Sequence, residues 1–219
     1  MSLTLLARLS ALRAHRWLQV FVIYVRYLIG GAYVFSSVPK IMGERFMTLS
    51  GAEAPINTFP HFFETLYRSG FYWEFLGWSQ VLSGLLLMTQ VYATLGAVAF
   101  FAISVNVFVI TISYEFGGTP VITGLMLLAN IFLLIWDYQK LKVLLLPDKS
   151  LIPSVRNHDN PFYYDLFWMY LGLVIFLTTV FYVILNGRNP MLWFLFCVAE
   201  GLSGWVYMKW KYRNQYNTV

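Results

Sequence analysis

Apolar residues form six long runs along the chain, and polar segments separate them. The runs lie at Leu18–Val38, Trp73–Gln90, Thr94–Ser113, Thr119–Trp136, Tyr164–Leu185 and Met191–Met208. A helix needs about 20 mostly apolar residues to cross the hydrocarbon core of a bilayer, and each run is close to that length. No run shows the alternation of a membrane β-barrel strand, so the pattern predicts an all-α integral membrane protein with six transmembrane helices.

The composition supports a lipid-embedded chain and excludes a soluble globular enzyme. Of the 219 residues, 59% are hydrophobic and 11% are charged, whereas a soluble domain has roughly a quarter charged residues. A chain of 25.4 kDa cannot bury so large an apolar excess within its own core. The net charge of +5 comes from basic residues spread between the apolar runs, so nucleic acid is not an expected partner.

The placement of lysine and arginine predicts the orientation in the membrane. With the N-terminus inside, the cytoplasmic side collects ten basic residues: Arg8, Arg13, Arg16, Lys140, Lys142, Lys149, Arg156, Lys209, Lys211 and Arg213. The outer side then holds Lys40, Arg45, Arg68 and Arg188. The positive-inside rule therefore puts both termini in the cytoplasm, and the expected location is the inner (cytoplasmic) membrane of a bacterium.

Two segments between the runs organise the chain. In the first outer loop, the aromatic residues of Phe59–Tyr67 fall on one helical face, which predicts either an interfacial helix on the outer leaflet or a lid over a cavity. The segment Asp137–Pro161 concentrates charges and prolines. It separates a four-helix core (1–144) from a connector and a C-terminal two-helix hairpin (145–219), which we interpret as parts of one membrane domain.

Five of the runs carry a polar residue in the middle third of the membrane: Arg26, Gln80, Asn106, Asn130 and Glu200. A charge at this depth is costly unless it is paired or faces a cavity, so these are candidate site residues. Arg26 and Glu200 lie at equal depth on the first and last runs, which predicts an ion pair between them. The group as a whole has two interpretations, hydrogen-bonded contacts between helices or a ligand or proton site.

A second polar group lies at the outer ends of the runs. It comprises Lys40, Glu74 and Glu115, and the depth of Lys40 and Glu74 permits a contact between them. Charges that only mark the interface explain the same residues. Trp78 and Trp205 are candidate aromatic walls of an interior site.

The sequence lacks the residues that common redox and metal chemistry needs. The single cysteine, Cys197, excludes a dithiol pair, and the three histidines lie outside the apolar runs. Neither a transmembrane haem nor a cysteine–histidine zinc site is therefore expected. No flavin, nicotinamide or iron–sulfur motif occurs, so redox chemistry would need a partner or a bound quinone.

Several motifs of the first four runs form a known pattern. They are Arg26 with Gly30, the exit sequence Phe35-Ser-Ser-Val-Pro-Lys40, and Gln80-Val-Leu-Ser-Gly84 followed by leucines. With these motifs, the chain from about Tyr24 to Leu144 resembles the DoxX-like family of small membrane proteins. Two positions depart from the family, because Gln80 stands where glutamate is usual and Ser37 where glycine is usual.

The resemblance implies one of two roles. Some DoxX-like proteins are membrane subunits of quinone-linked oxidoreductases that act on sulfur compounds, and others are membrane partners of soluble redox enzymes. We expect an auxiliary or scaffolding membrane subunit without catalysis of its own, which contacts lipid and other protein subunits and is compatible with a bound quinone or lipid. A quinone-linked oxidoreductase subunit and a small transporter or proton-conducting channel are the alternatives.

Overall fold

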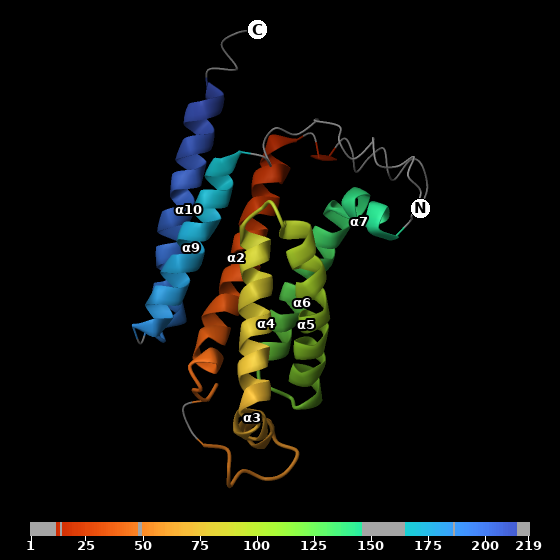
Figure 1. Cartoon of the computed structure of the whole chain (residues 1–219), viewed down its shortest axis with the longest axis vertical. Helices are drawn as coiled ribbons and strands as arrows, with labels where there is room; N and C mark the ends of the chain where they lie inside the picture. Colours follow the sequence, from red (N-terminus) through yellow and green to blue (C-terminus); the bar gives the residue numbers. More distant parts are fainter. Residues whose placement is uncertain (1–11, 14, 48–49, 146–164, 186, 214–219) are drawn as a thin grey trace.

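The computed structural model describes residues 12–13, 15–47, 50–145, 165–185 and 187–213, and this part of the chain is helical (Figure 1). Its helices are α2 (Arg16–Ile41), α3 (Phe59–Arg68), α4 (Phe71–Met88), α5 (Ala93–Ser113), α6 (Thr119–Trp136), α7 (Tyr138–Leu145), α9 (Leu166–Ile184) and α10 (Pro190–Arg213). Most of the proline-rich connector lies outside the described residues, as do Arg8, Lys149 and Arg156 of the predicted topology.

The described helices confirm an all-α protein suited to a membrane. Five of them are long and apolar enough to cross a bilayer: Arg16–Ile41, Ala93–Ser113, Thr119–Trp136, Leu166–Ile184 and Pro190–Lys211. The run expected as the second span is also a helix, α4, but polar residues such as Glu74 and Gln80 leave it outside this set.

Helix α2 is the centre of the molecule. The most apolar stretch of α2 is 61% buried, against 22–33% for the other four membrane-compatible helices, which therefore turn most of their surface outwards. Figure 1 shows α4, α5 and α6 on one side of α2 and the hairpin α9–α10 on the other. The helices thus form a four-helix unit with an added hairpin.

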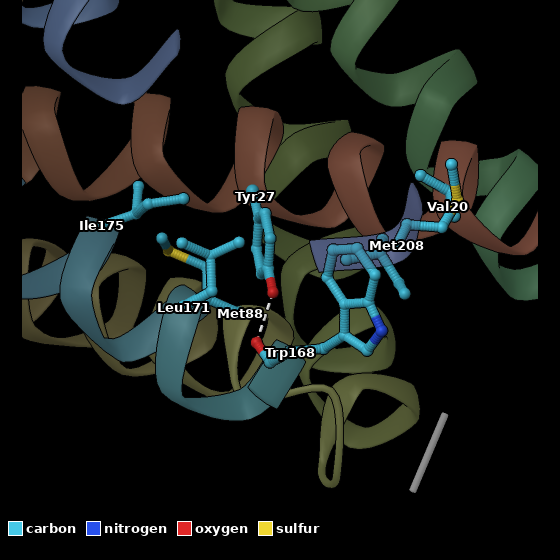
Figure 2. Packing of buried hydrophobic residues seen from close by; sticks show 8 residues of the cluster. Val20, Tyr27, Met88, Trp168, Leu171, Ile175 and Met208 are labelled. Carbon is cyan, nitrogen blue, oxygen red and sulfur yellow. Dashed lines mark hydrogen bonds between the residues drawn. The ribbon is translucent and has the colours of Figure 1, made fainter. Parts of the chain in front are cut away.

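Two faces of α2 pack against these two neighbours. Val22, Ile29 and Tyr33 share one face at helical spacing, and they pack with apolar residues of α4, α5 and α6. Tyr27 lies on a different face, among Trp168, Leu171 and Ile175 of α9 (Figure 2). There its hydroxyl donates a hydrogen bond to the Trp168 carbonyl.

Small residues allow the helices to approach each other closely, as expected in a membrane bundle. Gly30 and Gly84 meet where α2 crosses α4, since a Cβ added to Gly84 would lie 2.9 Å from the Gly30 carbonyl oxygen. A Cβ added to Gly172 would lie only 2.1 Å from the Met88 carbonyl oxygen. Gly172 therefore fixes how closely the hairpin docks on the four-helix unit.

The segment between α2 and α4 folds over one end of the bundle, and we call its described residues 42–47 and 50–70 the cap. The helix expected at Phe59–Tyr67 is present as α3, which lies across the bundle end beside the start of α4 (Figure 1). Its aromatic side chains contact the first part of the cap and the α5–α6 connection. The ring centres of Phe63 and Phe46 are 5.1 Å apart, and those of Phe59 and Phe116 are 4.5 Å apart. Phe59 and Phe63 are half-buried in these contacts, and both interpretations of α3, the interfacial helix and the lid, stay predictions.

Glu64 of α3 ties the cap together. Its carboxylate is 5% exposed and accepts hydrogen bonds from Arg45 Nε and Arg68 Nε, both at 3.0 Å, and from the Gly51 backbone N–H at 3.3 Å. The hydrogen bond from Arg45, opposed by burial of the carboxylate and reinforced by Arg68, lowers the pKa of Glu64 to about 2. The cap is therefore held by a charged centre rather than by apolar packing alone.

Candidate functional site

Arg26 forms a buried ion pair with Asp137, where α2, the α4–α5 connection and the end of α6 meet. The Arg26 side chain is 1% exposed, and its Nη2 lies 2.8 Å from Asp137 Oδ2. Its Nη1 donates to Gln90 Oε1 at 2.9 Å, and Thr94 Oγ1 donates to Asp137 Oδ2 at 3.0 Å. The arginine that the sequence singled out is thus neutralised inside the four-helix unit.

The predicted ion pair between Arg26 and Glu200 is wrong. Glu200 instead accepts a hydrogen bond from Thr178 of α9, at 2.5 Å. The prediction compared only the depths of the two residues in the membrane. It did not consider on which face of its helix each residue lies. Tyr24 lies on a face of α2 that meets α10, since its hydroxyl donates to the Gly201 carbonyl at 2.5 Å. Arg26 points about 200° away from Tyr24 at 3.6 residues per turn.

Gln80 joins Lys40 and Ser37 at the cap end of α2. Lys40 is buried and donates from Nζ to Gln80 Oε1 at 2.6 Å, and Ser37 Oγ donates to the same oxygen at 2.5 Å. The ammonium also lies 5.6 Å from the centre of the Trp73 ring. Lys40 is therefore part of the interior rather than of a surface cluster.

Lys40 and Glu74, whose depths permit a contact, do not pair. Glu74 is exposed on the first turn of α4, while Lys40 turns towards Gln80. Glu115 is exposed in the α5–α6 connection. The three charges expected as one group are separate because α2 buries its last turn against α4, and only Lys40 lies on that face.

The two asparagines of the predicted polar group differ in their surroundings. Asn106 is exposed on α5 and donates to the Ala102 carbonyl of its own helix at 2.8 Å, so it does not belong to an interior site. Asn130 of α6 is 0% exposed, and neither its side-chain nitrogen nor its oxygen has a hydrogen-bond partner in the described structure. A buried amide without partners carries its full desolvation penalty.

We expect Asn130→Leu to raise the melting temperature of the purified protein. Leucine has a similar size and removes two unpaired polar atoms, whose burial costs about 1–3 kcal/mol. Asn106→Leu is the matched control, since its amide is exposed and already bonded, and it should change melting little. A lower melting temperature for Asn130→Leu than for the wild type would contradict this interpretation of Asn130.

An open cavity of about 530 Å³ lies between α2 and α10, and Ile175 of α9 contributes to its lining. Phe21, Leu28 and Leu202 in this lining are about half exposed. Its lining is almost wholly apolar and aromatic: Phe21, Tyr24, Val25, Tyr27 and Leu28 from α2, and Trp193, Phe194, Cys197, Val198, Gly201, Leu202 and Trp205 from α10. Trp205 lines this cavity, which contains none of the predicted polar site residues, and Trp78 of α4 is not in the lining. Both tryptophans are partly exposed, at 40% and 51%. No local pattern indicates the cavity, because its two main walls, residues 21–28 and 193–205, lie at least 165 positions apart in the chain.

The size and lining of this cavity suit a small apolar molecule. Ligand pockets commonly measure 300–1,000 Å³ and combine apolar walls with a few polar groups. The polar side-chain groups of its lining residues are the hydroxyls of Tyr24 and Tyr27, the indole N–H groups of Trp193 and Trp205, and the thiol of Cys197. The Tyr24 hydroxyl is bonded to the Gly201 carbonyl, the Tyr27 hydroxyl to the Trp168 carbonyl and the Trp193 N–H to Thr179. Within the described ranges, no group of three or more His, Cys, Asp or Glu side chains could hold a metal ion.

The comparisons with known proteins found no matching family model, no matching curated protein and no matching solved structure. The fold and the cavity together define the class as an all-α protein with apolar, membrane-compatible helices. Contact with membrane lipid follows from those helices. The resemblance to the DoxX-like family stays a prediction.

Proposed function

We propose that this protein is an auxiliary integral membrane subunit that holds a lipid-like or quinone-like molecule inside the membrane. The observation that carries the proposal is the 530 Å³ cavity between α2 and α10. Its aromatic walls come from two parts of the chain, so an occupant would also stabilise the docking of the hairpin on the four-helix unit. Such a molecule is what the surrounding bilayer supplies in high concentration.

In the proposed arrangement the chain crosses the membrane six times. Helix α4 lies between α2 and α5, and it turns polar residues such as Gln80 and Ser83 into the bundle. A helix shielded in this way tolerates more polar residues than a lipid-exposed one. The count of basic residues then places both termini in the bacterial cytoplasm and the cap on the outer side.

The chemistry of the cavity supports the auxiliary role. Its lining has no carboxylate, imidazole or basic side chain, and the hydroxyls of Tyr24 and Tyr27 already donate to backbone carbonyls. The Arg26–Asp137 pair is satisfied within the protein and lies on the other side of α2. The subunit therefore holds its ligand, and partner subunits of the kind that the DoxX-like resemblance implies would supply any reaction.

Native mass spectrometry of the protein released from its own membrane tests this proposal. We expect a bound lipid or quinone on the wild type and its loss in Val198→Trp, because the indole would fill the cavity. Val109→Trp makes the same change on the exposed surface of α5 and should keep the ligand. Equal retention by both variants would contradict the proposal, and a redox-active quinone as the bound species would favour the oxidoreductase subunit.

A further inference from the structure

A lysine stands at one end of the cavity. Trp205 lines the cavity, and Lys209, one helical turn further along α10, holds its Nζ 3.6 Å from the centre of the Trp205 ring. Lys209 is exposed, and its Nζ has no carboxylate within ion-pair distance among the residues that the structure describes. The contact with the indole keeps this positive charge beside the cavity wall.

The neighbouring lysine of α10 has a different environment. Lys211 Nζ lies 2.6 Å from Asp165 Oδ2, and the same carboxylate oxygen accepts a hydrogen bond from the Tyr207 hydroxyl at 2.8 Å. The charge of Lys211 is therefore neutralised inside the hairpin. Of these two lysines, only Lys209 is left to attract an anion, and it is the one beside the cavity.

Helix α2 contributes an aromatic side chain near the same end of the cavity. Phe21 lines the cavity, and Trp17, one turn earlier in α2, is largely exposed. Figure 1 shows the start of α2 and the last turns of α10 at the same end of the molecule. Exposed tryptophan and lysine at the ends of membrane helices lie at the depth of lipid headgroups.

We infer that the ligand of the cavity is an acidic phospholipid, with an acyl chain between α2 and α10 and its phosphate at Lys209. This inference rests on the proposed function and names the ligand class for the same cavity. The apolar walls select a hydrocarbon chain, and the uncompensated charge of Lys209 selects the headgroup. A neutral quinone has no negative group to pair with Lys209. The cationic group of a zwitterionic headgroup would be repelled by the charge of Lys209.

Lipid titration of the purified protein in detergent tests the inference. Phosphatidylglycerol and phosphatidylcholine with identical acyl chains are compared by native mass spectrometry. We expect the wild type to prefer phosphatidylglycerol by about fivefold, the equivalent of about 1 kcal/mol for one lysine near an anionic lipid. Lys209→Gln should abolish the preference, and Lys211→Gln, the control, should retain it.

Different outcomes would overturn the headgroup assignment and the proposed function. Equal affinity of the wild type for both lipids, or an unchanged preference in Lys209→Gln, would overturn the assignment to Lys209. Displacement of phosphatidylglycerol by excess inorganic phosphate would also overturn it, since it would show an anion site that does not need the acyl chain. Absence of binding of either lipid to the wild type would instead overturn the proposed function.

Discussion

Asp137→Asn should destabilise the protein by about 3–5 kcal/mol, the usual cost of removing one partner of a buried ion pair. Arg26 and Asp137 are 1% and 6% exposed, so the stranded guanidinium would have little access to water. A guanidinium stays charged in proteins, so Arg26 cannot escape this cost by releasing its proton. Chemical or thermal unfolding in detergent measures the loss.

Further variants test whether this loss of stability comes from the Arg26–Asp137 ion pair. Arg26→Leu should be milder, because Asp137 keeps the Thr94 hydroxyl as a hydrogen-bond donor and lies 3.9 Å from Lys140 Nζ. The double variant Arg26→Leu with Asp137→Leu should recover most of the loss. Glu200→Gln is the control, since Glu200 is bonded to the neutral Thr178, and an effect as large as that of Asp137→Asn would contradict the pairing.

Gly172→Ala should destabilise the docking of the hairpin by about 1–3 kcal/mol or more, the range for overpacked sites. The added Cβ would lie 2.1 Å from the Met88 carbonyl oxygen and 2.8 Å from Tyr27 Cε1. A backbone carbonyl at the end of a helix cannot move aside as a flexible side chain can, so α9 must shift away from α2 and α4. The cavity between α2 and α10 would change shape with it.

Thermal melting and ligand retention together check this prediction. Gly124→Ala on α6 is the matched control, because Gly124 lies outside the cavity lining and its nearest neighbour is the Phe108 side chain at 3.0 Å, which can shift by a small amount. We expect Gly172→Ala to melt earlier and to lose bound lipid, and Gly124→Ala to change both properties less. Wild-type behaviour of Gly172→Ala would show that the hairpin does not dock through this contact.

The helices could be predicted from sequence because lipid imposes a local requirement. A backbone in hydrocarbon must satisfy its own hydrogen bonds, so an apolar run of sufficient length forms a helix whatever its neighbours. The run at Thr119–Trp136 coincides with α6, and the aromatic face of Phe59–Tyr67 correctly predicted α3. These elements depend on spacing within one segment.

The contacts between helices could be predicted only in part, because depth does not give direction. Arg26 was correctly singled out as a residue that needs a partner, but the partner required the face of α2 on which it lies. Val22, Arg26, Ile29 and Tyr33 follow one another at helical spacing, and this stripe could have shown that Arg26 turns away from Tyr24. Asp137 stands just after the fourth apolar run, and the long side chain of Arg26 reaches it.

The cap and the cavity depend on contacts that no local pattern encodes. Glu64 and Arg68 are spaced for a contact on one helix, but Arg45 and the Gly51 backbone come from a loop of irregular structure. The cavity needs α10 to stand away from α2 while α9 packs against it, which depends on Gly172. A prediction of these features requires knowledge of which helices pack against each other.

Photo-crosslinking in the native membrane tests whether the cavity between α2 and α10 holds an acidic phospholipid. Benzoylphenylalanine replaces Phe194 in the cavity wall or Phe181, which is exposed on α9 outside the cavity lining. After irradiation, the attached molecules are identified by mass spectrometry. We expect one dominant acidic phospholipid attached at position 194. At position 181 we expect a mixture of lipids with the composition of the bulk membrane. The same mixture at both positions would contradict this expectation.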